Sequence, residues 1–311
     1  MSNLGQITAI LRTDTGRVRG HNEDFVSYWE PPNREAEKES GWLYIVADGV
    51  GGADAGEVAS EMTTQRTINH YLEHADEENW GQRLLNAMQA ANSDLRQYVL
   101  ERNDNSRMAT TMVAAVLQEN RAYIANVGDS RGYLWRNGRI EQITKDQSLV
   151  AKLVEEGAIT EEEASYHPRR NVILYSLGSE RSPKIDLFEQ KLQKGDILFL
   201  CSDGLTRHVT DEEIALTLTE ESPEQATDTL IRKANERGGE DNISVAVILY
   251  EGETAVSSQK ETPARTKPLI VTHDAPANVI VLDRSLLWMY TVTLGLVQSL
   301  LIFLVWLLLR V

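Results

Sequence analysis

The sequence predicts an α+β domain built on antiparallel sheets. Five short apolar runs that end in turn residues are typical of buried strands: 41–49, 110–118, 122–128, 196–204 and 242–250. Asn137 and Gly138 form the pair favoured in tight hairpins, between two strand-like segments. Helical stretches occur as a pair between strands rather than after every strand, which favours antiparallel over parallel sheets.

The clearest helix is expected between the first two strands. Its apolar residues recur at spacings of four and three, which places them on one face of an amphipathic helix: Leu84, Met88, Ala91, Leu95 and Tyr98. We interpret this face as ordinary core packing.

Later segments differ in composition. Residues 145–182 are polar and irregular, and we expect them to form a mostly exposed flap. Residues 1–252 form the predicted folded domain, and residues 253–284, with many Thr, Ser, Pro and charged residues, form a predicted flexible linker.

The segment 285–309 is a predicted transmembrane helix. It runs 25 residues without a charge, and as a helix it would be about 37 Å long, against roughly 30 Å of bilayer hydrocarbon. Trp288, Tyr290 and Trp306 lie near its ends, where aromatic belts form. Because the N-terminus lacks the pattern of a signal peptide, we expect a single-pass anchor in the cell membrane with the preceding domain in the cytoplasm.

The charge and the cysteine content limit the classes of function that the chain can have. The formal net charge is −16, from 47 Asp plus Glu against 31 Lys plus Arg, so the chain is expected to repel nucleic acid. Cys201 is the single cysteine, which excludes an intramolecular disulfide. We interpret it as a core residue and not as the nucleophile of a cysteine phosphatase.

Acidic residues recur where predicted strands meet turns: Glu23, Asp24, Asp48, Asp129, Asp203 and Asp241. Carboxylates at strand ends can converge at one edge of a sheet although they are distant in sequence. An all-oxygen set of this kind suits Mg²⁺ or Mn²⁺ rather than Zn²⁺, which prefers His and Cys.

The order of five segments resembles the protein phosphatase 2C family of metal-dependent serine/threonine phosphatases: Arg19–Asp24, Asp48–Gly52, Gly128–Arg131, Ser202–Gly204 and Gly239–Asn242. The resemblance covers about residues 7–250. It implies a four-layer α/β/β/α sandwich, in which two antiparallel sheets pack face to face between helices. It also implies two Mn²⁺ or Mg²⁺ ions at one end of the sheets.

The resemblance implies a role for each metal-binding position. Asp48 matches the carboxylate that bridges the two metals. The Gly49 carbonyl and Glu23 match ligands of the second metal, and Asp203 and Asp241 match ligands of the first.

Four further positions follow from the same resemblance. Asp129, with Asp203, matches the residues that hold a third, weaker metal in bacterial-type members. Asp24 matches a residue that orients water at the metals. Arg19 matches the arginine that grips the substrate phosphate, and Asn242 matches a neighbour of the site.

The implied reaction is hydrolysis of phosphoserine and phosphothreonine by direct attack of water. Two cations can activate a water and neutralise the phosphoryl oxygens, while Arg19 recognises phosphate in a bidentate manner. The implied partners are phosphoproteins, such as Ser/Thr kinases and their substrates, close to the membrane. The oligomeric state stays open.

One position departs from the family pattern. Many eukaryotic members carry a histidine after the Asp-Gly, as the acid for the leaving group, and this chain has Val50 there. The acid is therefore unassigned, with water at the metals as first choice and His21 as a lesser candidate. A regulatory phosphatase of a partner-switching pathway and a non-catalytic binding relative are the alternative functions.

Overall fold

The computed structural model describes residues 5–51, 55–75, 79–102 and 107–253. The predicted linker beyond residue 253 and the predicted span 285–309 lie outside these ranges. Within the described ranges, every helix is too short or too polar to cross a bilayer.

The first sheet has five antiparallel strands. Their spatial order is β1 (Gly5–Asp14), β10 (Ile243–Glu253), β9 (Ile197–Cys201), β6 (Arg131–Arg136) and β7 (Arg139–Gln142). The predicted hairpin turn joins β6 to β7, with positive φ at Asn137 and Gly138. This backbone conformation suits Asn and Gly, so the prediction is confirmed.

The second sheet is also antiparallel throughout. Its order is β2 (Asp24–Trp29), β3 (Trp42–Val50), β4 (Ala109–Gln118), β5 (Arg121–Val127) and β8 (Asp186–Lys191). A short helix, α1 (Arg34–Ser40), lies between β2 and β3 in the chain.

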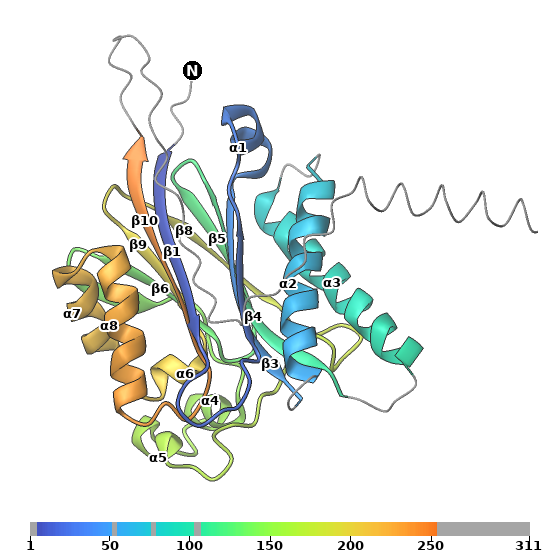
Figure 1. The fold of residues 1–311 in the computed structure, drawn as a ribbon, viewed down its shortest axis with the longest axis vertical. Coiled ribbons are helices and arrows are strands. Elements are labelled where there is room, and N and C mark those ends of the chain that lie inside the picture. The colour runs from blue at the N-terminus through green and yellow to red at the C-terminus, as the bar shows by residue number, and fades with distance from the viewer. Residues whose placement is uncertain (1–4, 52–54, 76–78, 103–106, 254–311) are drawn as a thin grey trace, which may run out of the picture. The chain divides into compact units, whose positions relative to one another are not determined.

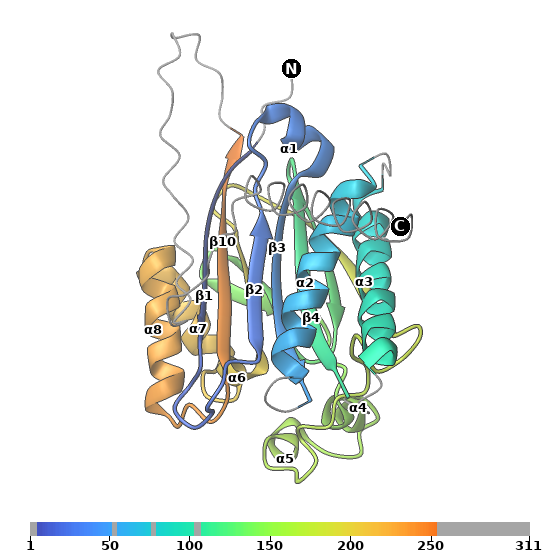
Figure 2. The same ribbon diagram turned by 45° about the vertical axis from the view of Figure 1, so that its right-hand side comes forward.

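Helices cover the outer face of each sheet (Figures 1 and 2). On the second sheet these are α2 (Ala55–Glu73) and α3 (Trp80–Arg102), and on the first sheet α7 (Asp211–Glu220) and α8 (Pro223–Glu236). The predicted amphipathic helix is α3. The expected four-layer α/β/β/α sandwich is thus confirmed within the described residues.

Three apolar layers hold the sandwich together. Val46 and Leu198 lie in the core between the sheets. Their chain neighbours point the other way: Ile45 packs under α2 and α3, and Phe199 packs under α7 and α8. The continuous apolar runs at β3 and β9 follow from this burial on both faces.

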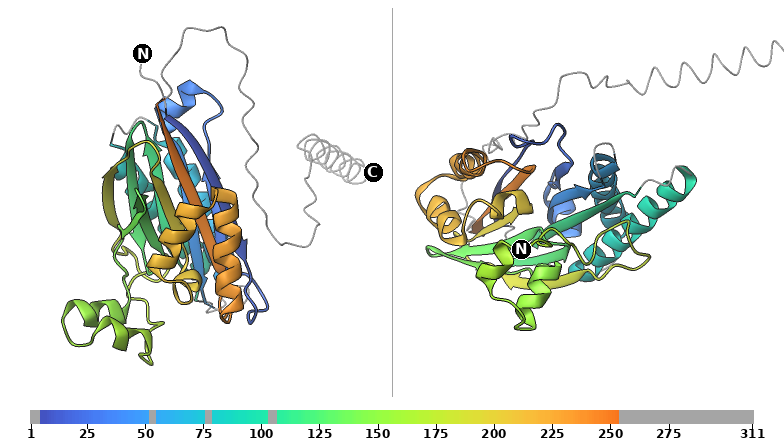
Figure 3. Two further views of the ribbon diagram at one scale, coloured as in Figure 1. Left: turned by 90° about the vertical axis from the view of Figure 1, so that its left-hand side faces the viewer. Right: turned by 90° about the horizontal axis from the view of Figure 1, so that it is seen from below.

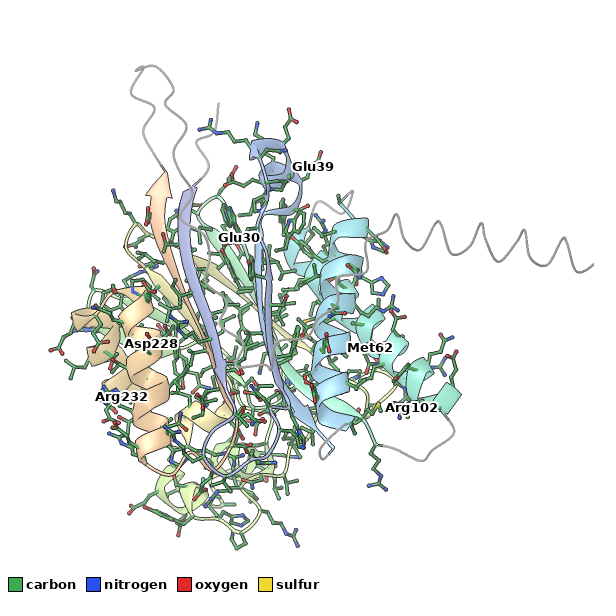
Figure 4. The ribbon with its side chains drawn as sticks, viewed as in Figure 1. Glu30, Glu39, Met62, Arg102, Asp228 and Arg232 are labelled. Atoms are coloured by element: carbon green, nitrogen blue, oxygen red, sulfur yellow. The ribbon has the colours of Figure 1, made fainter. Side chains whose placement is uncertain are left out.

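Charged side chains lie on the outside of the helices. Arg232 on α8 and Arg102 on α3 point away from the sheets (Figure 4). Asp228 of α8 forms a 2.7 Å ion pair with Arg12 of β1, which ties α8 to the sheet edge.

One predicted boundary needs correction. The predicted strand at 196–204 ends at Cys201, and a one-turn helix, α6 (Asp203–Thr206), begins after Ser202. The strand ends there because the Ser202 hydroxyl receives the backbone N–H of Ser244 at 3.0 Å and itself donates to Asp24, so the side chain takes part in the end of the sheet.

The segment 145–182 is mostly exposed, as predicted, but it is not wholly irregular. It contains α4 (Leu149–Glu155) and α5 (Glu161–Ser165), which project from the end of the sandwich that carries α6 (Figures 1 and 3). Ser148 caps α4, and Thr160 with Glu163 forms a capping box on α5. These local caps stabilise two short helices that contain no buried residue.

Candidate metal centre

The six predicted carboxylates come together at one end of the two sheets. They lie on the loop before β2, at the start of β2, near the end of β3, after β5, at the start of α6 and before β10: Glu23, Asp24, Asp48, Asp129, Asp203 and Asp241. Burial raises the pKa of Asp48 well above its ordinary value, and the charges of Asp24, Asp203, Asp129 and Asp241 raise it further. Asp48 is therefore the centre of the cluster.

Strand register brings Asp24 and Asp48 together. The two residues are direct partners across β2 and β3. Asp24 Oδ2 accepts a 2.8 Å hydrogen bond from Ser202 Oγ, whereas its buried Oδ1 has no partner. Burial raises the pKa of Asp24 to about 7, although the neighbouring hydroxyls of Ser244 and Ser202 act in the opposite direction.

Two glycines make room for Glu23, which is 9% exposed. A Cβ at Gly56 of α2 would lie 2.5 Å from Glu23 Oε2, and a Cβ at Gly49 would lie 2.2 Å from the Gly56 carbonyl oxygen. The Glu23 carbonyl accepts the Gly49 N–H at 3.1 Å and the Ser60 hydroxyl at 2.6 Å. The ligand role of the Gly49 carbonyl stays a prediction.

Asn242 organises the loop that leads to Glu23. Its amide donates to the carbonyls of Thr15 at 2.9 Å and His21 at 3.0 Å, and its Oδ1 accepts the Glu23 N–H at 2.8 Å. Asn242 is 4% exposed. The predicted neighbour of the site is thus a buried anchor that holds the loop in place.

Asp129 and Asp203 lie on the side of the first sheet. Burial raises the pKa of Asp129 to about 8, and the charges of Asp203 and Asp146 raise it further, while Arg207 lowers it. Burial also raises the pKa of Asp203, and Arg207 opposes this rise. One buried carboxylate oxygen of each aspartate, Oδ1, has no hydrogen-bond partner.

Two arginines neutralise part of this cluster. Arg19 Nη2 lies 2.9 Å from Asp241 Oδ1, and its side chain is 47% exposed. Arg207 donates to Asp203 and lies 3.3 Å from Asp241 Oδ2. Arg207 is not among the site residues predicted from the sequence, although its position four residues after Asp203 could have indicated it, since residues at this spacing meet on a helix.

The residue types fit hard divalent cations. Every donor in the cluster is an oxygen, and Asp24, Asp129 and Asp203 each have a buried oxygen without a partner. In the part of the chain that the structure describes, however, no three of its acidic, His or Cys side chains are already arranged to hold an ion. Two of the expected ligands, Asp203 and Asp241, instead bond to arginines.

Five residues lie between Cys201 and Arg207, which is the Cys-to-Arg spacing of cysteine phosphatases, so the spacing alone does not exclude that class. The structure excludes that role. The Cys201 side chain is fully buried under α7 and α8. Burial raises the pKa of its thiol, although Arg131 lowers it. The Arg207 guanidinium bonds to Asp203 and not to a phosphate-binding loop around the sulfur.

The flap approaches the cluster from outside. Arg170 lies 3.9 Å from Glu240, the residue before Asp241. Val50 is 39% exposed and cannot transfer a proton. His21 lies in the loop that Asn242 holds, and its charge is among those that lower the pKa of Glu23, although burial raises that pKa overall.

Comparisons with known proteins identify the family of the chain. A family model described as protein phosphatase 2C matches residues 21–243. The serine/threonine phosphatase stp of Listeria innocua is 40% identical over 247 residues, which cover 77% of this chain and 94% of that protein. The chain therefore belongs to the protein phosphatase 2C family.

Solved structures share the fold. The serine/threonine phosphatase Stp1 from Staphylococcus aureus has a TM-score of 0.72 at 37% identity, and the match covers 81% of this chain and 98% of that chain. The catalytic domain of the phosphatase PstP, in complex with two manganese ions, has a TM-score of 0.67 at 36% identity. This match covers 79% of this chain and 99% of that chain.

Proposed function

We propose that this chain hydrolyses phosphoserine and phosphothreonine in proteins at a centre of two Mn²⁺ or Mg²⁺ ions. The observation that carries the proposal is the convergence of six carboxylates from separate segments, with unpartnered buried oxygens, beside an accessible arginine. Membership of the protein phosphatase 2C family and the two manganese ions in PstP support the same reaction.

One group of residues would bind the cations, and another would bind the phosphate. Glu23, Asp48, Asp203 and Asp241 would hold the two ions, and Asp129 with Asp203 would form a third, weaker site. When bound, the ions supply a water-derived nucleophile at neutral pH and neutralise charge on the phosphoryl group.

Arg19 would bind the phosphate. Its guanidinium is half-exposed at the rim of the cluster, and it can offer two parallel N–H groups to two phosphate oxygens. Asp24 is buried one strand away from Asp48 and held by Ser202, so it can orient a water beside the cluster. Val50 cannot protonate the leaving seryl or threonyl oxygen, so this proton comes from another group.

The direct test is turnover of a phosphothreonine peptide by the full chain in detergent with Mn²⁺. We expect Asp48→Asn and Asp241→Asn each to lower kcat/KM at least about 100-fold, since even residues that only support a ligand cost 10- to 100-fold when lost. Asp228→Asn, at an exposed side chain of α8, is the matched control and should retain activity. Turnover that persists in EDTA, or that survives both ligand substitutions, would refute the proposal.

We also propose that the chain is anchored in the cell membrane by residues 285–309, with the phosphatase domain on the cytoplasmic face. The support is sequence alone: 25 uncharged, largely apolar residues between Arg284 and Arg310. Phosphoproteins close to the membrane, including Ser/Thr kinases and their substrates, are then the favoured targets. Retention of the full chain in carbonate-washed membranes tests this anchor.

A further inference from the structure

Arg207 faces the carboxylate cluster and has no part in the mechanism above. It directly follows α6, and its backbone N–H donates to the Asp203 carbonyl at 3.0 Å. Its side chain reaches back over the same turn: Nη2 donates to Asp203 Oδ2, and Nη1 lies 3.3 Å from Asp241 Oδ2. One guanidinium thus joins two carboxylates from separate segments.

These are the carboxylates that the proposed mechanism needs for a metal ion. Asp203 offers Oδ2 to Arg207, and only its Oδ1 is without a partner. Both oxygens of Asp241 have donors: Oδ1 accepts from Arg19 and from the Asn242 N–H, and Oδ2 accepts from Arg19 and Arg207. A divalent cation on these oxygens would lie close to the guanidinium, and like charges repel strongly at such distances.

We propose that Arg207 competes with the metal ions for Asp203 and Asp241, and that it thereby sets the metal affinity of the site. The inference rests on the proposed metal-dependent function and adds a regulator to the same site. The positive charge of Arg207 keeps the two carboxylates together until a cation displaces it. Its side chain is 23% exposed, so the guanidinium has a path to solvent.

The ion pair between Arg131 and Asp146 is a structural pair that can be compared with the contacts of Arg207. Arg131 binds both oxygens of Asp146, at 2.7 to 3.0 Å, and ties the start of β6 to the segment after β7. Neither residue of this pair is an expected metal ligand. Arg207 differs because its two acceptors belong to the cluster itself.

A competing Arg207 and a purely structural Arg207 predict different changes in Mn²⁺ affinity when the residue is removed. If Arg207 competes, removing its charge strengthens Mn²⁺ binding, because the carboxylates become free. If it only supports the fold, removal leaves Mn²⁺ binding unchanged or weakens it, because Asp203 and Asp241 lose their positions.

The experiment is Mn²⁺ titration by calorimetry on the full chain in detergent, after the removal of bound metal. Arg207→Asn should lower the Kd about tenfold, which corresponds to about 1.4 kcal/mol. Arg207→Lys keeps the charge without the two-pronged geometry and should lie between wild type and Arg207→Asn. Arg232→Asn removes one positive charge from the outer face of α8 and should leave the Kd unchanged.

Thermal unfolding supplies a second readout. In EDTA, Arg207→Asn should unfold at a lower temperature than wild type, because the carboxylates then repel one another without a counter-charge. Saturating Mn²⁺ should close this gap. A ligand that binds only the folded state stabilises it, and the variant is expected to bind Mn²⁺ more tightly than wild type. A structural arginine would instead lower the unfolding temperature under both conditions.

The possible results distinguish a failure of this inference from a failure of the proposed function. An unchanged or higher Kd for Arg207→Asn, with lower stability under both conditions, overturns this inference alone. Absence of Mn²⁺ binding by the wild-type chain overturns the proposed function and the inference together. If Arg207→Asn does not fold, Arg207→Lys decides: a Kd no lower than that of wild type overturns the inference.

Discussion

Gly56→Ala is expected to damage the metal centre although Gly56 binds nothing itself. Gly56 is the second residue of α2, and in a helix an exchange of Gly for Ala normally stabilises a protein by about 0.5–1 kcal/mol. Here the new Cβ would lie 2.5 Å from Glu23 Oε2, 2.9 Å from Glu23 Cδ and 3.0 Å from the Gly49 carbonyl carbon. Both Glu23 and the end of β3 would have to move.

The magnitude follows from the two opposing effects. Overpacking of a filled site costs about 1–3 kcal/mol. After the helix gain is subtracted, the free energy of unfolding should fall by about 0.5–2 kcal/mol. Because Glu23 is a predicted ligand, the Kd for Mn²⁺ should rise about 10- to 100-fold, the usual cost of disturbing a group that positions a ligand.

Gly81→Ala is the matched control. Gly81 is the second residue of α3, and the first atom that its Cβ would meet is the far end of the Leu187 side chain, at 2.8 Å, which can rotate away. Urea unfolding in EDTA and Mn²⁺ calorimetry on both variants separate the two cases. Equal Mn²⁺ affinity of Gly56→Ala and wild type would refute the reasoning that Glu23 needs this glycine.

Two further predictions concern pH and the membrane. Burial raises the pKa of Asp24 to about 7 and of Asp129 to about 8, so between about pH 4 and pH 8 the folded state holds protons that the unfolded chain has already released. In EDTA, the free energy of unfolding should therefore fall as the pH rises over this range. A urea midpoint that rises over the same range would contradict the raised pKa values of these two aspartates. The full chain should stay in carbonate-washed membranes, whereas a chain ending at residue 253 should be released; release of the full chain would exclude the anchor.

Much of the site could be predicted because its residues stand at strand ends in a fixed order. Asp48 follows an apolar run, and Asp203 follows another, so strand periodicity and turn residues together indicated where each carboxylate belongs. The predicted strand at 196–204 nevertheless extended too far, because nothing local shows that Ser202 bonds to Asp24 and Ser244 from other strands.

The sequence by itself determined the antiparallel strands and the acidic residues at their ends, since both depend on patterns that neighbouring residues in the chain carry. The sandwich followed from the resemblance of the ordered segments to a known family. Only the tertiary structure decided how these groups meet. It placed Glu23 against Gly56, made Asn242 the anchor of the Glu23 loop, and brought Arg207 between Asp203 and Asp241. These contacts join segments far apart in the chain or depend on side-chain direction, and packing alone sets them.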